Sequence, residues 1–462
     1  MIVIKFGGAA MADSDNVRNS VEYIKKIRDK KPVVVVSAMK GVTDILIKTI
    51  DDAVNKRNKN VLDNTNMLRV KHEKPVNELI NSEKLKNEAL KYFNESFLEL
   101  YSIFKSISVL GECSPKTYDY VVSMGEKLSS KIVASVLLDE GILAEQVIGE
   151  DLIVTDSNFT NAFPNMESTE KKVKSRLSSP DTIPIITGFT GANEKRETTT
   201  LGRGGSDFTA SILAYCLNAE EAWFLKEVDG ILTADPKLVA NAKTVARMSY
   251  DEVAELSYFG AKVLHPVAIL PLKEKQIPSF IKNVYSFDFI GTEITNKKIT
   301  NGHPIKAITA IKDASLITVQ SQGMVGIPGI VARTFSAIAK SNINVQMISQ
   351  SSSEQNICFI IKITDQMKAI AALNKEFELE IIKKQIGHIS SEDGVSIVCA
   401  VGEGMKNIPG IAGKIFSVLG DNKINIKLIA QGSSELNVSF VIDSKCVDSA
   451  INCIHEEFNL GG

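Results

Sequence analysis

The glycine-rich segment 198–207, with the sequence TTTLGRGGSD, contains the residue types of an anion-binding loop. Its three glycines let backbone amides approach a phosphate group closely, and the helix predicted to follow adds partial positive charge at its start. Arg203 lies inside the loop and Asp207 on the first turn of that helix. The spacing matches neither the G-x-x-x-x-G-K-[ST] phosphate loop nor the G-x-G-x-x-G dinucleotide motif. The glycines alone would fit a plain turn and helix cap equally well, and the enclosed arginine favours an anion.

Three further segments that could carry chemistry follow predicted strands. Lys5, Gly7 and Gly8 end the first strand, where the charge of the lysine could neutralise a phosphoryl group during transfer. Residues 37–44 and 188–191 contain small and hydroxyl side chains and close two other strands. Because the carboxyl ends of parallel strands meet at one edge of a sheet, we expect these segments at one site. Taken singly, each would also fit an ordinary strand end or loop.

Glu126 ends the segment SMGE, 123–126, which we predict to be a turn beside an apolar helix. A carboxylate there suits an ammonium ion. The guanidinium of Arg203 can hold a carboxylate in a bidentate fork. The pair therefore predicts a zwitterionic ligand beside a polyphosphate.

The elements that must position these residues are those of an α/β domain over residues 1–295. Short runs rich in Val and Ile, at 1–6, 33–37 and 183–187, predict buried strands of a mainly parallel, open sheet with helices on both faces. Predicted helices include 17–29 and 206–217. The charged, glycine-poor stretch 51–112 predicts a helical excursion from the sheet.

The remainder of the chain contains a repeat. A shift of 81 residues aligns 323–354 with 404–435 at 15 identities in 32 positions, which indicates a duplicated module. Each copy predicts the ferredoxin-like order βαββαβ. The predicted strands are 316–320, 345–350, 357–363 and 377–382 in the first copy and 396–401, 426–431 and 436–442 in the second, and the predicted helices are 330–340, 366–374, 411–419 and 447–457.

The second copy lacks a last strand, and the apolar run 305–311 has no module of its own. An open sheet edge is a liability, so we expect this run to complete the second copy. The first module, 313–385, is then an insertion within the second, which consists of 303–312 and 394–462.

The composition excludes several classes of protein. The chain has 462 residues, with 53 Lys and Arg against 55 Asp and Glu, and its pI is about 6.3. This balance argues against binding to nucleic acid or to an anionic membrane through bulk charge. No apolar run resembles a signal peptide or a membrane span. Six scattered cysteines and five isolated histidines predict a reduced, cytoplasmic protein without a structural metal site.

Taken together, the segments resemble the aspartokinases, which belong to the amino-acid kinase superfamily and carry two C-terminal ACT modules. The resemblance covers essentially the whole chain. It rests on KFGG at 5–8, SMGE at 123–126, GFTG at 188–191, TTTLGRGGSDFTA at 198–210, KEVDGILTADP at 226–236 and SYDEVAELSYFGAKVLHP at 249–266. The repeats ISQSSSEQN and IAQGSSELN look most like the aspartokinase halves of bifunctional aspartokinase–homoserine dehydrogenases. We expect no dehydrogenase within these 462 residues.

The resemblance implies ATP-dependent phosphorylation of the β-carboxylate of L-aspartate with Mg²⁺, the first step of lysine, threonine and methionine biosynthesis. It implies that Lys5, Mg²⁺ and the loop amides stabilise the transferring group, that Arg203 and Glu126 hold the α-carboxylate and α-ammonium of aspartate, and that Asp207 orients Lys5 or a metal-bound water. The other implied substrate-binding residues are Ser37, Thr43, Phe189 and Ser206. The implied nucleotide-binding residues are Lys5, Gly7, Gly8, Lys226, Glu227, Leu232, Lys237 and Lys262.

The sequence departs from the family pattern in two places. Ala9 and Ala10 stand where hydroxyl residues commonly follow KFGG, so backbone amides must make the phosphate contacts there. Lys226 and Glu227 replace the more usual Thr-Asp, and Leu232 stands where an aromatic residue often packs.

The ACT pair implies feedback inhibition by an amino acid that binds between modules of two subunits, in a homodimer or a dimer of dimers. The implied effector residues are Met324, Gly329, Ile330, Val331, Val345, Gln346 and Gln350, with Gln431 as a counterpart in the second copy. Lysine would favour an acid near 345–346, where Gln346 is neutral, whereas the glutamines at 350 and 431 could suit threonine. The sequence leaves both effectors open.

Two alternative functions remain at this stage. One is another kinase of the superfamily, acting on glutamate, N-acetylglutamate or a nucleoside monophosphate. The other is an amino-acid sensor whose kinase domain has decayed, for which Ala9 and Ala10 are the only support.

Overall fold

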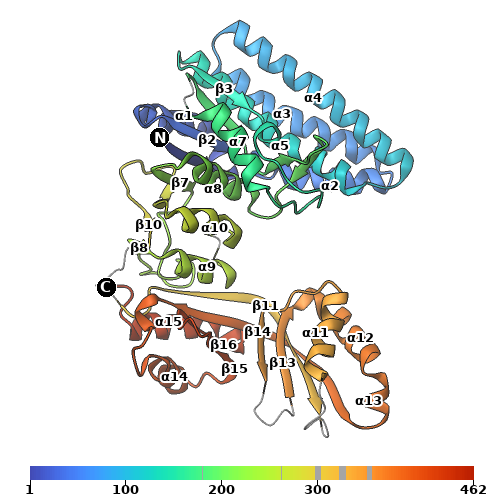
Figure 1. Cartoon of the computed structure of the whole chain (residues 1–462), viewed down its shortest axis with the longest axis vertical. Helices are drawn as coiled ribbons and strands as arrows, with labels where there is room; N and C mark the ends of the chain where they lie inside the picture. Colours follow the sequence, from blue (N-terminus) through green and yellow to red (C-terminus); the bar gives the residue numbers. More distant parts are fainter. Residues whose placement is uncertain (179–180, 262, 297–302, 322–328, 351–355) are drawn as a thin grey trace. The chain divides into compact units, whose positions relative to one another are not determined.

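A computed structural model describes residues 1–178, 181–261, 263–296, 303–321, 329–350 and 356–462 (Figure 1). The chain divides into two compact units. The first contains Met1–Ile231, Thr244–Ala254 and Val263–Lys298, and the second contains Leu232–Lys243, Glu255–Lys262 and Ile299–Gly462.

The first unit is built on an eight-stranded sheet in the order β3-β4-β2-β1-β7-β9-β10-β8. The strands from β3 to β9 in this order are parallel, β10 runs antiparallel to β9, and β8 is parallel to β10. A small hairpin, β5-β6, lies apart from it. The strands are β1 (Ile2–Phe6), β2 (Pro32–Val36), β3 (Ala144–Val147), β4 (Ile183–Thr187), β5 (Thr190–Ala192), β6 (Thr198–Thr200), β7 (Glu221–Lys226), β8 (Arg247–Met248), β9 (Ser279–Asn283) and β10 (Thr292–Ile294). The predicted mainly parallel sheet is confirmed.

The strand order reverses at β1. From β1 the chain adds β2 and β4 on one side, whereas β7 and β9 lie on the other. The loops that leave the carboxyl ends of β1 and β7 therefore diverge, which is where open α/β sheets bind ligands. Every residue of β1 and of β2 is buried, as expected for central strands covered on both faces.

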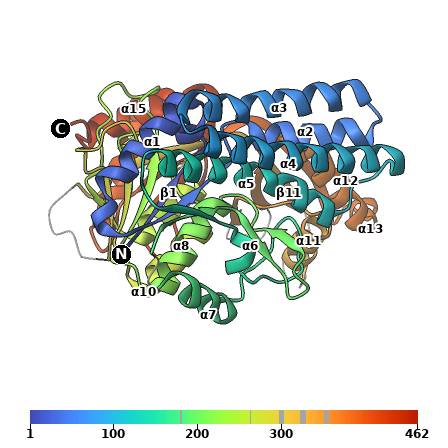
Figure 2. The ribbon, with the colours of Figure 1, turned by 90° about the horizontal axis from the view of Figure 1, so that it is seen from above.

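Helices cover the two faces of this sheet (Figure 2). On one face, α1 and α5 pack with Ile4, Phe6 and Val34 in a core that extends into the helical excursion. On the other face, α8 contacts β1, β2 and β7, and α7 and α10 contact α8. The helices are α1 (Ser14–Lys26), α2 (Val42–Val54), α3 (Asn58–Leu79), α4 (Glu83–Leu110), α5 (Pro115–Asp139), α6 (Gly149–Leu152), α7 (Met166–Leu177), α8 (Gly205–Leu217), α9 (Tyr250–Tyr258) and α10 (Pro266–Lys275).

The turn predicted for 123–126 is wrong, because these residues lie inside α5. Gly125 suggested a turn, but its role is close packing. A Cβ atom there would lie 2.8 Å from the Cβ of Ala38 and 3.2 Å from Cγ1 of Val42. The missing side chain lets α5 approach the segment between β2 and α2, and this sets Glu126 against that segment.

The second unit contains a six-stranded antiparallel sheet in the order β12-β13-β11-β14-β16-β15. The strands are β11 (Ala307–Ser321), β12 (Met347–Gln350), β13 (Asn356–Lys362), β14 (Ile386–Val401), β15 (Ile426–Ala430) and β16 (Asn437–Asp443). The helices are α11 (Ile330–Lys340), α12 (Gln366–Glu376), α13 (Glu378–Ile382), α14 (Ile411–Asp421) and α15 (Val447–Glu457). Each copy of the repeat has its own apolar core.

Two long strands run through both copies. The first half of β11, Ala307–Ile311, pairs with Ile397–Val401 of β14 in the second copy, and its later residues pair with β13 and with the start of β14 in the first copy. The prediction that the run 305–311 would supply a strand to the second copy is therefore confirmed for Ala307–Ile311.

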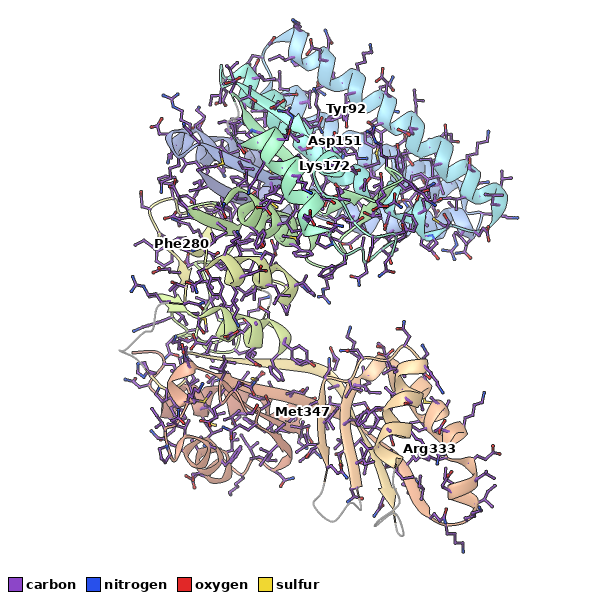
Figure 3. All side chains as sticks on the ribbon, in the orientation of Figure 1. Tyr92, Asp151, Lys172, Phe280, Arg333 and Met347 are labelled. Atoms are coloured by element: carbon purple, nitrogen blue, oxygen red, sulfur yellow. The ribbon has the colours of Figure 1, made fainter. Side chains whose placement is uncertain are left out.

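The strand predicted at 377–382 is wrong, because Glu378–Ile382 is a short helix and the first copy ends on β14 instead. The alternation of Phe377, Leu379 and Ile381 is typical of a strand, but Leu379 is 66% exposed. Arg333, which is labelled in Figure 3, forms ion pairs of 2.8 Å with Glu376 and 2.6 Å with Glu380. Carboxylates four residues apart face one partner only in a helical turn.

Within the described residues, no helix combines the length and apolar character needed to cross a membrane. The six cysteines are free thiols. The same residues contain no group of three or more His, Cys, Asp or Glu side chains arranged to hold a metal ion.

We predict that Gly125→Ala destabilises the chain by about 1–3 kcal/mol, since the added methyl group overpacks the contact with Ala38. Gly420→Ala, in the last turn of α14, is the matched control because a Cβ there meets nothing within 4 Å. The control should stabilise its helix by up to about 1 kcal/mol. Urea denaturation followed by circular dichroism measures both, and equal effects of the two changes would contradict the packing role of Gly125.

Candidate active site at the carboxyl ends of the strands

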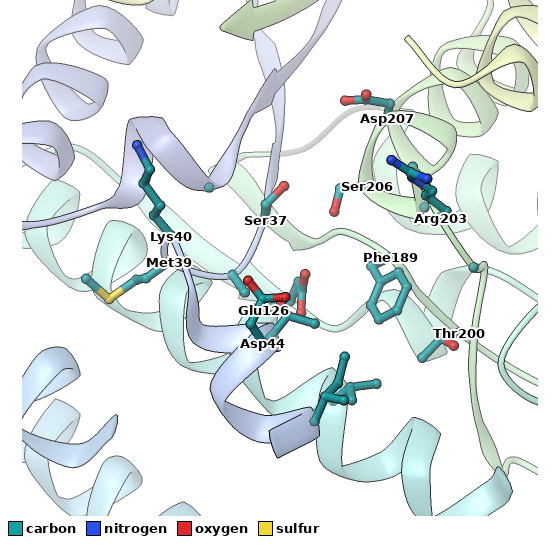
Figure 4. A pocket seen from close by; sticks show the side chains of 18 of the residues that line it. Ser37, Met39, Lys40, Asp44, Glu126, Phe189, Thr200, Arg203, Ser206 and Asp207 are labelled. Carbon is teal, nitrogen blue, oxygen red and sulfur yellow. The ribbon is translucent and has the colours of Figure 1, made fainter. Parts of the chain in front are cut away.

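A cavity of about 880 Å³ opens in the first unit at the carboxyl ends of β1, β2 and β4 (Figure 4). We call it the main cavity. It brings together the glycine-rich loop, the ends of three strands and one face of α5. The lining residues are Lys5, Gly8, Ala9, Ser37, Ala38, Met39, Lys40, Gly41, Thr43, Asp44, Ile47, Tyr118, Val122, Glu126, Thr160, Phe189, Thr200, Gly202, Arg203, Gly204, Gly205, Ser206 and Asp207.

A buried charge cluster forms one wall of the main cavity. Nζ of Lys5 lies 2.6 Å from Oδ1 of Asp207, and Nζ of Lys226 lies 3.1 Å from Oδ2 of the same carboxylate. The side chains of Lys5 and Asp207 are 7% and 8% exposed. Lys5 reaches Asp207 because alternate residues of β1 face opposite sides of the sheet, and α8, which starts at Gly205, covers the side that Lys5 faces.

The ionisation of this cluster follows from its geometry. Burial alone would raise the pKa of Asp207, but the charges of Lys226 and Lys5 hold it at about 2. Burial lowers the pKa of Lys5 from its usual value, and the charge of Lys226 lowers it further, while Asp207 opposes both effects. The ionised carboxylate of Asp207 thus holds two lysine side chains at the point where the strand order of the sheet reverses.

Glu126 is the second buried acid of the cavity. It is 4% exposed, and within the described residues its Oε2 has no hydrogen-bond partner. Burial raises the pKa of Glu126 to about 8, against the opposing effect of the backbone amide of Ala38. A buried polar atom without a partner is uncommon. This one faces a cavity that a ligand cation can enter.

Arg203 lies in the exposed part of the glycine-rich loop, between two glycines with left-handed backbones. Gly202 has φ of 70° and Gly204 has φ of 77°. A Cβ on Gly204 would lie 2.4 Å from the Cβ of His265, so this position requires glycine. Arg203 lines the main cavity together with Ser206 and Asp207, and all three are labelled in Figure 4.

Phe189 occupies a conformation that is rare for a residue with a side chain. Its φ is 71°, and hydrogen bonds of 2.9 Å to Oγ1 of Thr209 and from the amide of Leu201 hold its backbone. Such a conformation costs about 1–3 kcal/mol and is found mainly at functional sites. The ring of Phe189 packs against Gly205, where a Cβ would lie 2.6 Å away.

All eight of the predicted substrate and catalytic residues line the main cavity. These are Lys5, Ser37, Thr43, Glu126, Phe189, Arg203, Ser206 and Asp207. Of the predicted nucleotide residues, Lys5 and Gly8 also line it, whereas Gly7 does not. Lys226 contacts the site through Asp207, and Glu227 lies 3.7 Å from Lys40.

Three predicted nucleotide residues are not part of the described first unit, and one predicted effector residue is not described. Leu232 and Lys237 belong to the second unit. Lys262 and Met324 lie outside the described residues.

The sequence analysis missed one face of the cavity. Tyr118 and Val122 precede Glu126 on α5 by eight and four residues, and all three line the cavity. Spacing of four residues on a helix was the available signal. Thr160 and Thr200 also line it, and buried Asp119 holds both by accepting hydrogen bonds from their amides at 2.8 Å and 2.9 Å.

The predicted effector residues that the structure describes lie in the second unit. Gly329 and Ile330 begin α11, with Val331 41% exposed. Among the described residues, Oε1 of Gln346 is buried without a hydrogen-bond partner. The hydroxyl of Tyr258 donates to the carbonyl of Gln346 at 3.2 Å. Val345 precedes β12, Gln350 ends β12, and Gln431 follows β15.

Comparison with known proteins shows which proteins this chain resembles. Residues 1–283 match the amino acid kinase family, and residues 317–377 and 398–458 each match the ACT domain. The chain is 31% identical over 466 residues to bifunctional aspartokinase/homoserine dehydrogenase 1 of Arabidopsis thaliana, covering 99% of this chain and 51% of that protein. It therefore spans about half the length of such relatives. It is also 30% identical to aspartokinase 3 of Arabidopsis thaliana, covering 81% of that protein.

Solved structures show the same architecture. Aspartokinase III of E. coli, determined in complex with aspartate and ADP, superposes with a TM-score of 0.84 at 26% identity and covers 99% of this chain and 100% of that one. The complex of the same enzyme with lysine and aspartate gives a TM-score of 0.80 at 26% identity, and the two cover 99% of each other.

We predict that Glu126→Gln removes a pH dependence of stability between pH 5 and pH 8. The folded-state pKa of about 8 is above the ordinary value of 4.5. The contribution of Glu126 to the free energy of unfolding is therefore complete below about pH 4.5 and is lost as the pH rises through about 8. In urea denaturation, the free energy of unfolding of the variant should increase relative to that of the wild type as the pH rises from 6 to 8. The surface change Glu194→Gln should show no such gain, and parallel behaviour of Glu126→Gln and wild type would contradict the burial of an ionisable group.

Proposed function

This chain belongs to the amino acid kinase family and, within it, to the aspartokinases, and we propose that it transfers the terminal phosphoryl group of ATP to the β-carboxylate of L-aspartate. The products are 4-phospho-L-aspartate and ADP. The observation that carries this proposal is the presence, in one cavity, of the Lys5–Asp207–Lys226 cluster, the unpartnered carboxylate of Glu126 and Arg203. The solved complex of a relative with aspartate and ADP supports it.

The main difficulty of this reaction is electrostatic. A carboxylate is already a nucleophile, so no strong base is required, but two anions must meet. Buried Lys5 and partly buried Lys226 supply fixed positive charge where the phosphoryl group would pass. Each ammonium group has three N–H donors, and Asp207 accepts from one of them. The other N–H groups of Lys5 and Lys226 are available to phosphate oxygens.

The amino-acid substrate is held at its other end in this proposal. Arg203 pairs with the α-carboxylate, and Glu126 accepts from the α-ammonium, which also favours the ionised form of Glu126. The lining residues Ser37, Thr43, Phe189 and Ser206 shape the space between them. The β-carboxylate then faces Lys5.

We propose that ATP lies along the ends of β1 and β7, with Gly7 and Gly8 offering backbone amides and Lys226 and Glu227 at its edge. Mg²⁺ would neutralise phosphate charge when bound. The donor set fits a cation that is carried mainly by the phosphates, because Lys5 and Lys226 already occupy Asp207 and the described residues hold no group of three acidic or nitrogen ligands. Leu232, Lys237 and Lys262 remain proposed nucleotide residues.

We also propose that the ACT copies bind a feedback effector, lysine or threonine, in a homodimer or a dimer of dimers. The solved complex of E. coli aspartokinase III with lysine supports an amino-acid effector. The proposed effector residues are Met324, Gly329, Ile330, Val331, Val345, Gln346, Gln350 and Gln431.

The division into a kinase domain, 1–295, and the two ACT modules given above is part of this proposal. A cytoplasmic location is also part of it and is supported by six free thiols.

Formation of aspartyl hydroxamate from ATP, Mg²⁺ and L-aspartate tests the reaction. Activity should require aspartate rather than glutamate, and lysine or threonine should suppress it and so identify the effector. Activity with glutamate would indicate another kinase of the family. A folded protein without activity would instead support a decayed sensor.

Lys5→Ala should lower kcat by at least about 100-fold, as loss of one fixed donor to a transition-state charge does elsewhere, with little change in the KM for aspartate. Lys171→Ala, on the exposed surface of α7, is the matched control and should leave kcat unchanged. Steady-state kinetics with both substrates measures this, and an unchanged kcat in Lys5→Ala would remove this lysine from the phosphoryl site.

Arg203→Ala should raise the KM for aspartate by at least about 10-fold, the value of a charge-assisted hydrogen bond, and leave the KM for ATP near its original value. The same kinetics separates the two parameters. A loss confined to ATP would assign Arg203 to the nucleotide.

A further inference from the structure

A second cavity, of about 540 Å³, lies in the first unit and shares no lining residue with the main cavity. We call it the Trp223 cavity. It lies where β7 and β9 meet the end of α1 and the turn Arg28–Lys30. Its lining residues are Lys26, Ile27, Asp29, Lys30, Glu221, Trp223, Phe280, Lys282 and Phe287. None of them has a part in the proposed phosphoryl transfer.

The floor of this cavity is aromatic and fixed in place. Trp223 on β7 and Phe280 on β9, which is labelled in Figure 3, are paired in the parallel register, with ring centroids 6.5 Å apart. The indole Nε1 donates a hydrogen bond of 2.7 Å to Oε2 of Glu221, two residues earlier on the same face of the strand. The indole is buried, whereas the rings of Phe280 and Phe287 are partly exposed.

Three lysine side chains converge on these rings. Nζ of Lys30 lies 4.8 Å and Nζ of Lys282 lies 4.3 Å from the centroid of the Trp223 ring. Nζ of Lys26 lies 4.9 Å from the centroid of the Phe287 ring. Burial lowers the pKa of Lys282 from its usual value, and the charge of Lys30 lowers it further, while the charge of Glu221 opposes both effects. Two cations that share one ring thus oppose each other.

The acidic residues of the cavity offset only part of this charge. Glu221 is engaged by the indole and lies 4.0 Å from Lys30. Asp29 has a side chain that is 96% exposed, and its near cation is Arg28, at 3.8 Å. In the part of the chain that the structure describes, no carboxylate lies within 4.0 Å of Nζ of Lys26 or Lys282. Cation–π contacts at such sites are weak, so they explain the position of the lysines without balancing their charge.

We propose that the Trp223 cavity is a second binding site, for a small organic anion that carries at least two negative charges. Its charged groups would bridge the ammonium groups of Lys30, Lys282 and Lys26 and relieve their repulsion. Its carbon skeleton would lie against Phe280 and Phe287. The volume falls in the range of small-molecule sites, about 300–1,000 Å³. Phosphate esters and polycarboxylates share this chemistry, and the site does not depend on the proposed kinase reaction.

The chain offers a direct reporter, since Trp223 is its single tryptophan. The full chain is titrated with fructose 1,6-bisphosphate and, separately, with citrate, and the tryptophan fluorescence is compared with that in NaCl of equal ionic strength. We expect a saturable change with at least one of the two probes. The probe that binds more tightly identifies the anion as a phosphate ester or as a polycarboxylate.

Matched variants locate the site. Lys30→Gln with Lys282→Gln should raise the dissociation constant at least 10-fold, whereas Lys171→Gln with Lys195→Gln, two exposed lysines elsewhere, should leave it unchanged. Lys30→Gln alone serves if the double variant does not fold, because the side chain of Lys30 is 51% exposed.

Three outcomes with the probes and the lysine variants would overturn the proposal. They are the absence of a saturable change with both probes, a change that NaCl reproduces, and an unaltered dissociation constant in the Lys30 and Lys282 variants. Arg203→Ala provides the remaining control. Loss of the response in this variant would place the anion in the main cavity instead.

Discussion

A carboxylate with one ammonium group on each oxygen is the interaction on which the main cavity depends. Without Asp207, Lys5 and Lys226 would be two like charges at the edge of a sheet, and burial would favour the neutral form of Lys5. With it, two positive charges are retained for one negative charge. Transfer of each ion from water into the protein costs about several kcal/mol, and the attraction within a well-paired cluster offsets about the same amount. The cluster therefore contributes more to function than to the stability of the fold.

Close backbone approach is the second requirement of this site. Gly188 lies where a Cβ would be 2.7 Å from the Cβ of Ser206, and Gly204 and Gly205 face His265 and Phe189 in the same way. The loop is therefore compressed between α8, α10 and the end of β4. This packing fixes the direction in which Arg203 projects. The glycines serve the shape of the cavity as much as contact with an anion.

The local sequence pattern correctly predicted the strands and helices that local interactions determine. The runs 1–6, 33–37 and 183–187 are strands because they are short and rich in Val and Ile, and the predicted helices at 206–217 and 330–340 are α8 and α11 to within one residue. The failures had long-range causes: α5 continues through SMGE because Gly125 packs on Ala38, and 377–382 is helical around Arg333. No local pattern could reveal the Trp223 cavity, since Lys30 and Lys282 meet only through the pairing of β1, β7 and β9.

The shared strands β11 and β14 also have a consequence for the history of the repeat. Each of these strands begins in one copy and ends in the other, so no single cut through the backbone separates the copies. Exchange of one copy by recombination needs two crossovers, one within each shared strand near the register shift between Ile311 and Ala314. A domain joined by a linker needs only one.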